Sequence, residues 1–251
     1  MTQSKKALLE LAPHAIWLNY WLSTNVESAA KGLRRLGYKI EGFEGANLKN
    51  APLDPKTIVK GSIYTVRMAL HYLGFPQPAN LDIPESLQKY THRKVWNTTL
   101  GMVRKTRKSV FIKPADVQKG FMGHVFMPFH YDYLTDSLPS NYKVLASEVV
   151  DFETEWRVYV LKGEILGVRS YEGGYMGNAP PPRSFLQQMI RDFKEAPVSY
   201  ALDVGKINSP GKKPVIALVE VNEGFALGNY GIPHIQYARM VEARWKEMTR
   251  T

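Results

Sequence analysis

The segment VIALVEVNEG, residues 215–224, guides our interpretation of this chain. Its apolar residues indicate a β-strand, and a strand directs alternate side chains to one face. Four side chains are therefore expected on the same face: Ile216, Leu218, Glu220 and Asn222. Carboxylate and carboxamide oxygens near a strand end suit Mg²⁺, which usually arrives with substrate phosphates. Asp203 lies in another short apolar run, SYALDVG, so Asp203, Glu220 and Asn222 are expected to form a magnesium site on neighbouring strands.

A lysine-bearing strand is predicted upstream, in VFIKPAD, residues 110–116. Lys113 stands where a purely structural strand would carry an apolar residue. A lysine at a strand end can bind a phosphate as a point charge, although many such lysines only reach solvent. We expect Lys113 to contact a phosphate.

These motifs occur in a fixed order: VFIKP, an acidic linker, ETEWR within a hairpin, LDV, and VEVNE. Over roughly residues 90–232 the ordered set resembles the ATP-grasp superfamily of carboxylate–amine ligases. The segments VKGSIYTVRMALHYLG and LGNYGIPHIQYARMVEARW are similar to an often phage-encoded clade in which one nucleotide-binding lysine is displaced. The resemblance implies a mixed α/β and α+β chain, in which two α+β lobes close on ATP after a small N-terminal α/β domain.

The resemblance also implies roles for individual residues. Glu148 and Val149, in ASEVVD, match the hinge between the lobes, where backbone groups bind adenine. Glu155 fits the carboxylate that binds the ribose. Arg157 shares its strand face and would point at the phosphates, although a Glu-x-Arg pair on a strand can also be a surface ion pair worth under ~1 kcal/mol.

Three further basic residues have weaker support. Lys94, in THRKVW, stands where the family often has an earlier lysine, and the adjacent Arg93 is an equal candidate. Lys119, in the loop QKGFMG, would cover the phosphates or be an ordinary exposed lysine. Arg169 could bind a substrate carboxylate in a bidentate manner. With a turn at Lys162–Gly163, however, Arg169 would pair with Trp156 and face away from Arg157 unless a bulge intervenes.

Composition restricts the class of protein. The 251 residues contain no cysteine, so disulfides, thiolate metal sites and thiol catalysis are excluded. No apolar run approaches the ~18 residues of a membrane span, and the N-terminus does not read as a signal peptide, so we expect a cytoplasmic protein. The net charge is +10, with one local cluster, RKTRK at 104–108. Because aromatic residues do not interleave with this cluster, a nucleic-acid partner is not expected.

Periodicity predicts the organisation of the chain. Strands are expected at AIWLNYWL and YKIEGF, with a helix between them that Asn25 begins and Gly37 follows. A second helix covers the region from Ile63 to Leu73. The proline-rich segment FPQPANLDIP then suggests a boundary between an N-terminal domain, 1–84, and an ATP-grasp domain, 85–251. In the second domain, helices are expected over 85–108, 183–196 and 235–248.

The sequence therefore predicts an ATP-dependent ligase that uses ATP and Mg²⁺ to join a carboxylate substrate to an amine substrate, an amino acid or a peptide. It would pass through an acyl phosphate and act as a monomer or homodimer. Two alternatives stay open: an ATP-binding phosphotransferase without ligation, and a basic nucleic-acid-binding protein.

Overall fold

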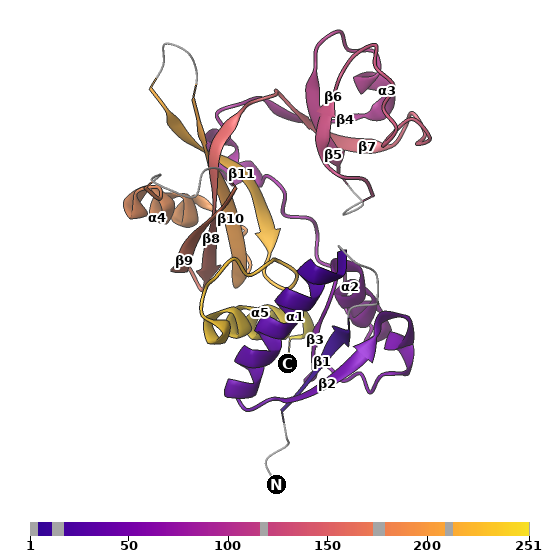
Figure 1. Ribbon diagram of the computed structural model, residues 1–251, viewed down its shortest axis with the longest axis vertical. Coiled ribbons are helices and arrows are strands. Elements are labelled where there is room, and N and C mark those ends of the chain that lie inside the picture. The colour runs from indigo at the N-terminus through magenta and orange to yellow at the C-terminus, as the bar shows by residue number, and fades with distance from the viewer. Residues whose placement is uncertain (1–4, 12–17, 116–119, 173–178, 209–212, 251) are drawn as a thin grey trace.

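The computed structural model describes residues 5–11, 18–115, 120–172, 179–208 and 213–250. Three β-sheets follow one another along the longest axis of the molecule, with the N-terminal unit at one end (Figure 1). No helix in these described segments is long and apolar enough to cross a membrane.

The N-terminal unit is a parallel sheet of order β2-β1-β3. Its elements are β1 (Lys6–Leu11), α1 (Leu18–Arg35), β2 (Lys39–Glu44), η1 (Gly45–Asn50), β3 (Ile58–Lys60) and α2 (Ile63–Tyr72). Ser62 begins α2, because its hydroxyl accepts a hydrogen bond of 3.1 Å from the Thr65 amide. Gly37 follows α1 with φ +83°, a conformation that glycine adopts without steric cost.

The start of this unit differs from the prediction. The first strand is β1, earlier than the expected strand at AIWLNYWL, and the Leu18–Leu22 part of that segment already belongs to α1. An apolar run of this kind cannot be assigned to a strand or a buried helix by periodicity alone. Asn25 consequently lies inside α1 instead of beginning it, and its Oδ1 accepts a hydrogen bond of 2.7 Å from the Asn229 amide.

The first antiparallel sheet has the order β4-β7-β5-β6. It comprises β4 (Val95–Thr99), β5 (Val110–Pro114), β6 (His124–Phe126) and β7 (Lys143–Ser147), with η2 (Glu85–Tyr90) before it and α3 (Leu100–Val103) after β4. The helix predicted over 85–108 is thus wrong for 95–99. The segment VWNTT carries residues that favour strands, and it pairs with β7 along its whole length.

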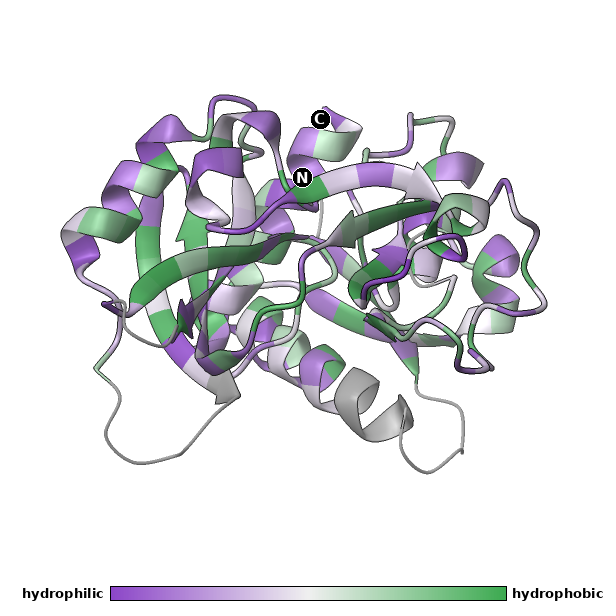
Figure 2. Ribbon diagram, turned by 90° about the horizontal axis from the view of Figure 1, so that it is seen from above, coloured by the Kyte–Doolittle hydropathy of each residue, from purple (hydrophilic) through white to green (hydrophobic). Residues whose placement is uncertain are grey.

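The second antiparallel sheet has the order β11-β10-β8-β9. Its strands are β8 (Phe152–Leu161), β9 (Glu164–Glu172), β10 (Ser199–Ile207) and β11 (Val215–Glu223), and α4 (Arg183–Asp192) covers one face. Leu186 and Met189 of α4 are buried in the same core as Val158 and Leu202 of the sheet. Hydrophobic residues are concentrated along the strands of the sheets (Figure 2).

A bulge changes the faces of β11. Asp203 pairs with Glu220, whereas the next residue, Val204, pairs with Leu218, so Val219 is the extra residue. Leu218 packs with Val204 in the core beneath α4, while Glu220 lies beside Asp203 on the opposite face. The expectation that Ile216 and Leu218 share a face with Glu220 and Asn222 is therefore wrong, although Glu220 and Asn222 do share one.

The β8–β9 hairpin has its turn where the sequence predicted it. Lys162 and Gly163 have φ values of +53° and +79°, as a tight two-residue hairpin turn requires. Beyond it Val160 pairs with Ile165 but Tyr159 pairs with Gly167, so one residue of β9 is extra. This bulge places Arg169 opposite Arg157, and the predicted pairing of Arg169 with Trp156 is wrong.

The last helix, α5 (His234–Thr249), joins the two ends of the chain. It packs along α1, and Tyr237 and Trp245 are buried in the same core as Leu8 and Leu33 of the N-terminal unit. The proposed boundary at residue 84 thus separates two segments of sequence that share one hydrophobic core.

Candidate active site

Lys113 lies where three segments meet. It projects from β5, and its Nζ forms ion pairs of 2.8 Å with Asp82 and 2.9 Å with Glu220. Asp82 belongs to the segment that links the N-terminal unit to the first antiparallel sheet, and its backbone pairs with Val221 of β11. Lys113 therefore joins the two antiparallel sheets across the cleft between them.

The charges of this cluster stabilise one another. Burial alone would lower the pKa of Lys113, but the carboxylates of Glu220 and Asp82 outweigh burial and raise the pKa above its ordinary value. Burial alone would raise the pKa of Glu220, yet Lys113, with smaller contributions from Asn222 and Arg157, holds it below the ordinary value. Both side chains are therefore charged at neutral pH.

Arg157 and Asp203 form a buried pair next to this cluster. Arg157 donates from Nε to Oδ1 of Asp203 at 2.8 Å and from Nη2 to Oδ2 at 2.6 Å. The Asn222 amide bridges the carboxylates, since its Nδ2 donates to Asp203 at 2.9 Å and to Glu220 at 3.0 Å. Tyr230 lies over the guanidinium of Arg157, with its ring centroid 4.9 Å away. The predicted trio of Asp203, Glu220 and Asn222 is thus one hydrogen-bonded group.

The trio meets the requirements of a magnesium site in part. Two carboxylates and a carboxamide match the few protein ligands that Mg²⁺ takes when phosphates and water supply the rest. Both oxygens of Asp203, however, accept hydrogen bonds from Arg157. Among the described residues, no cluster of three or more His, Asp or Glu side chains is arranged to hold a metal. The site therefore fits a cation that arrives with a phosphate better than one held by the protein alone.

A cavity of about 230 Å³ begins at Lys113 and extends between the two antiparallel sheets. Its walls are mostly apolar and include Ile83, Val95, Phe111, Val125, Leu145, Phe152 and Val219. Polar side chains lie at its margins, with Lys113 and Glu220 on one side and Glu155 on β8. Such a mainly apolar space with a few polar groups is typical of a small-molecule site.

The hinge segment between β7 and β8 forms one wall of the cavity. Glu148 and Val149 both line it, as the sequence predicted for this segment. Glu148 also fixes the start of β4, because its carboxylate accepts a hydrogen bond of 2.8 Å from the Lys94 amide and its own amide donates to the Lys94 carbonyl at 3.0 Å.

Of the two adjacent basic residues, Arg93 lines the cavity, whereas Lys94 is exposed and its ammonium lies 5.5 Å from the centroid of the Trp96 ring. Arg93 donates hydrogen bonds to the carbonyls of Leu218, at 2.7 Å, and Val219, at 3.0 Å. These carbonyls lie at the bulge in β11. Arg93 therefore holds the backbone distortion that turns Glu220 toward the cavity.

Two predicted residues have other positions. Lys119 lies outside the described residues. Arg169 stands on the same face as Arg157, but its Nε donates to the Gly231 carbonyl at 3.1 Å, and it does not line the cavity. Glu223, the neighbour of Asn222, is buried against Arg244 on the other face of β11.

Asp82 was missed by the sequence analysis. It lies in a proline-rich linker that has no periodic pattern, and the one signal is a carboxylate close to a proline in LDIP. Its φ of +39° is uncommon for a residue other than glycine, and this conformation accompanies the backbone pairing with Val221.

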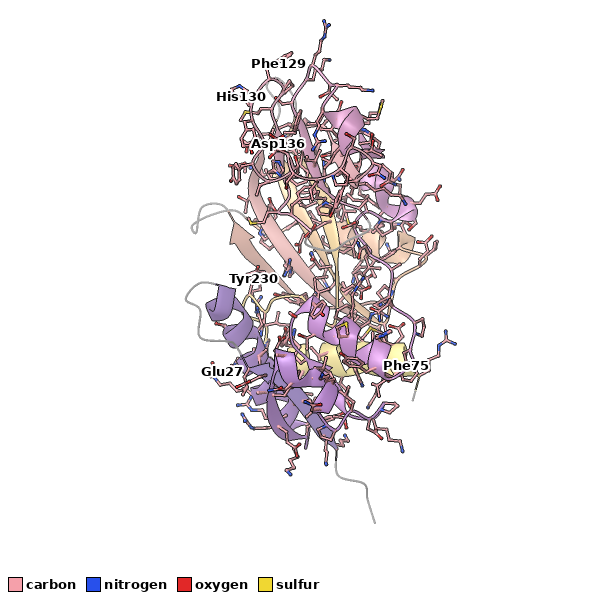
Figure 3. All side chains as sticks on the ribbon, turned by 90° about the vertical axis from the view of Figure 1, so that its right-hand side faces the viewer. Glu27, Phe75, Phe129, His130, Asp136 and Tyr230 are labelled. Atoms are coloured by element: carbon pink, nitrogen blue, oxygen red, sulfur yellow. The ribbon has the colours of Figure 1, made fainter. Side chains whose placement is uncertain are left out.

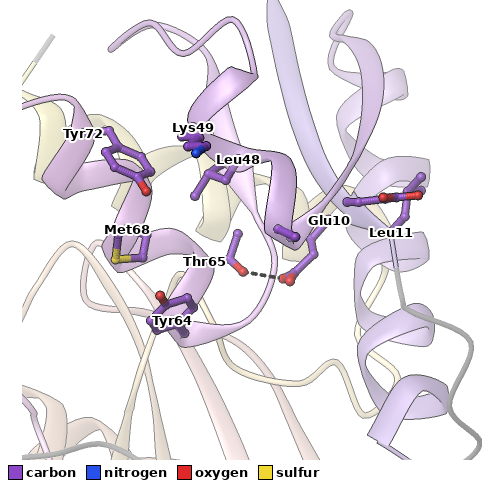
Figure 4. Close-up of a pocket in the computed structure, with 11 residues that line it drawn as sticks. Glu10, Leu11, Leu48, Lys49, Tyr64, Thr65, Met68 and Tyr72 are labelled. Atoms are coloured by element: carbon purple, nitrogen blue, oxygen red, sulfur yellow. Dashed lines mark hydrogen bonds between the residues drawn. The ribbon is translucent and has the colours of Figure 1, made fainter.

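A second, larger cavity lies in the N-terminal unit and shares no lining residue with the first (Figure 4). It has a volume of about 790 Å³ and lies between the ends of β1 and β2 and the side of α2. Glu10 at its base accepts hydrogen bonds from the Ser62 amide and the Thr65 hydroxyl, both at 2.7 Å. Tyr64 and Tyr72 form part of its rim.

Comparison with known proteins agrees with this architecture. Residues 90–240 match the model of an ATP-grasp domain, the second family of one ATP-grasp clade. No curated protein matches the sequence significantly.

Solved structures are similar along nearly the whole chain. The D-alanine–D-alanine ligase of Bacillus anthracis, solved with ATP, has a TM-score of 0.58 at 14% identity, and the match covers 98% of this chain and 97% of that one. A RimK-domain ATP-grasp protein of Sphaerobacter thermophilus has a TM-score of 0.53 at 14% identity, covering 94% and 98%. An N5-carboxyaminoimidazole ribonucleotide synthetase with ADP has a TM-score of 0.60 at 10% identity, covering 96% and 78%.

At these identities the structural matches establish the fold, while the family model covers more than half of the chain. The fold predicted from the ordered motifs is confirmed. The chain belongs to the ATP-grasp family.

Proposed function

We propose that this protein is an ATP-dependent ligase that joins a carboxylate to an amine through an acyl phosphate and releases ADP and phosphate. One observation carries the proposal: Lys113, Glu220, Asn222 and Asp203 converge at one end of an apolar cavity between two sheets of the ATP-grasp fold. Phosphate transfer needs charge neutralisation and alignment more than a covalent catalyst, and this site offers charges without an activated nucleophile.

The cavity would receive the nucleotide with its base among the apolar side chains. Glu148 and Val149 line the hinge, where main-chain groups would bind the base, and Glu155 would accept hydrogen bonds from the ribose. The volume of about 230 Å³ suits a nucleoside better than a whole nucleotide, so the phosphates would extend toward Lys113 and the carboxylates.

Lys113 would exchange one anion for another when the nucleotide binds. Its ammonium is paired with Asp82 and Glu220, and a phosphate could replace either carboxylate without leaving the buried ammonium unpaired. That exchange would free an oxygen of Glu220. Arg157 would keep Asp203 ionised and oriented, and Asn222 would set the spacing between the two carboxylates.

Mg²⁺ bound with the phosphates at Asp203, Glu220 and Asn222 would neutralise negative charge on the transferred group. In the reaction, a carboxylate oxygen of the substrate attacks the γ-phosphorus and the bond to ADP breaks. The amine then attacks the acyl carbon, phosphate leaves with the bonding electrons, and the amine loses a proton. Arg169, at the edge of the same face, could bind the substrate carboxylate. Because the reaction consumes ATP, we place this activity in the cytoplasm.

The proposal is tested by the products of the reaction. Purified protein, ATP and Mg²⁺ are incubated with pooled amino acids and peptides, and the mixture is analysed by mass spectrometry and nucleotide chromatography. We expect ADP together with a product whose mass equals the sum of two substrates less one water. Hydroxylamine in place of the amine should give a hydroxamate. Formation of AMP and pyrophosphate would indicate adenylation instead, and ADP with a phosphorylated product but no amide would indicate a phosphotransferase.

A further inference from the structure

The first antiparallel sheet carries an unusually exposed aromatic surface at its outer end. Phe129, Tyr131 and Tyr133 follow β6, and 93%, 80% and 77% of their respective surfaces are exposed. Figure 3 shows Phe129 and the adjacent His130 at the end of the molecule far from the N-terminal unit, and far from Tyr230 at the candidate active site. Proteins rarely leave so many large apolar side chains together in water unless the surface binds something.

The exposure follows from how the loop is built. Asp132, between the two tyrosines, is buried and accepts hydrogen bonds from the Thr135 hydroxyl at 2.5 Å and the Leu134 amide at 3.2 Å. His124 of β6 contacts the same carboxylate through Nε2 at 2.9 Å. With Asp132 fixed inward, Tyr131 and Tyr133 on either side are held outward.

The fold brings the basic cluster to this loop. Val110 at the start of β5 pairs with Phe126 at the end of β6, so the residues before β5 lie beside those after β6. At the other end of the cluster, the Nη2 of Arg104 donates to the carbonyls of Thr135, at 2.7 Å, and Leu138, at 3.0 Å. The segment 104–108 is thus attached at both ends to the borders of the aromatic loop.

The charge of this surface is predominantly positive. Lys105, Arg107 and Lys108 are exposed, and none forms an ion pair with a carboxylate of the described residues. Asp136 is the nearby exposed acid in the loop. Aromatic faces that stack bases, next to cations that contact phosphates, are the two components of a single-strand-binding surface.

We propose that Phe129, Tyr131 and Tyr133, together with Lys105, Arg107 and Lys108, bind single-stranded nucleic acid. The sequence alone argued against such a partner, because RKTRK has no aromatic neighbours along the chain. The β5–β6 pairing supplies those neighbours from a later segment. The surface is independent of the proposed ligase activity, because none of its residues lines the nucleotide cavity.

Fluorescence anisotropy with labelled oligo-dT and oligo-U of about 16 nucleotides tests the proposal, since this length covers the range of common single-strand sites. We expect binding at low salt that weakens as salt rises. Three phosphate contacts predict a slope of about −2 in a plot of log K against log salt. The variant Lys105→Ala/Arg107→Ala/Lys108→Ala should lose most of that slope, and each of Phe129→Ala, Tyr131→Ala and Tyr133→Ala should weaken binding by about 5-fold to 150-fold.

Matched variants in the N-terminal unit serve as controls. Arg34→Ala/Arg35→Ala removes two exposed cations from α1, and Tyr64→Ala removes a tyrosine that is 73% exposed, so both should bind like the wild type. All variants should retain ATP binding, which separates this test from that of the ligase. The proposal is overturned if the wild type does not bind single strands at low salt, or if the aromatic variants bind as the wild type does. Stronger binding to polyglutamate or to phosphatidylserine vesicles would overturn it in favour of an acidic protein or a membrane.

Discussion

Arg157 on β8 and Asp203 on β10 face each other and share two hydrogen bonds of 2.8 and 2.6 Å in a site where neither is more than 6% exposed. Removal of one partner would leave a buried charge. We expect Arg157→Met to lower the free energy of unfolding by about 3–5 kcal/mol, and Arg157→Met/Asp203→Leu to recover much of that loss. Urea denaturation of both variants measures this. Equal stability of the single variant and the wild type would mean that the pair is solvated.

Arg93 provides a second test, because it donates hydrogen bonds to two carbonyls at the bulge around Val219. We expect Arg93→Met to reduce ATP turnover because Glu220 and Asn222 lose their orientation toward the cavity. Since Arg93 acts through the backbone, Arg93→Lys should not restore activity, as lysine cannot bind both carbonyls with a planar fork. Turnover is measured with Lys94→Met as the matched neighbour, whose side chain does not line the cavity. Unchanged turnover in Arg93→Met would contradict a positioning role.

The comparison of Arg93 with Lys94 shows how far the sequence could lead. The order of Lys113, Glu155, Asp203 and Glu220 along the chain predicted the fold, and the turn at Lys162–Gly163 followed from local chemistry. Periodicity could not reveal the bulge at Val219, because an inserted residue leaves the composition of a strand unchanged.

Two other features depend on tertiary structure. Asp82 reaches the site from a linker because its backbone pairs with Val221, a contact between residues far apart in sequence. The strand at Val95–Thr99 exists because β7 pairs with it, and pairing of this kind overrides the local preference that suggested a helix.

The cluster around Lys113 predicts a specific pH dependence. In the wild type the pKa of Glu220 lies below its ordinary value of 4.5, so this carboxylate stabilises the fold above about pH 4.5, and the contribution is lost as pH falls through the lowered pKa. The pKa of Lys113 lies above 10.5, so its contribution is present at lower pH and is lost only as pH rises through that raised value.

We therefore expect Lys113→Met to be less stable than the wild type at neutral pH, with a difference that shrinks as the solution is acidified below about pH 4.5. Without Lys113, burial is the dominant influence on Glu220 and favours its protonated form. Thermal unfolding across the pH range measures the difference. Lys206→Met is the control, because its partner Glu153 is exposed and the pair should contribute little at any pH. A difference that grows on acidification would contradict the assignment.

The carboxylates of the site should matter for catalysis more than for folding. Glu220→Gln and Asn222→Ala each alter one group of the bridge between Asp203 and Lys113. We expect each to lower ATP turnover by at least about 10–100-fold, the range found when groups around a metal are removed, while the circular dichroism spectrum is unchanged. Glu153→Gln, an exposed change on β8, should retain full turnover. Wild-type rates in both site variants would place the magnesium site elsewhere.

The central claim is that ATP binds between the two antiparallel sheets with its phosphates at Lys113. Isothermal titration calorimetry with ATP and Mg²⁺ tests it most directly, with the wild type, Lys113→Met and the control Lys206→Met in parallel. We predict measurable binding to the wild type and the control, and at least tenfold weaker binding to Lys113→Met, because a phosphate would lose a direct charge partner worth about 1.5–3 kcal/mol. No binding to the wild type at millimolar ATP, or equal binding to Lys113→Met, would contradict the account.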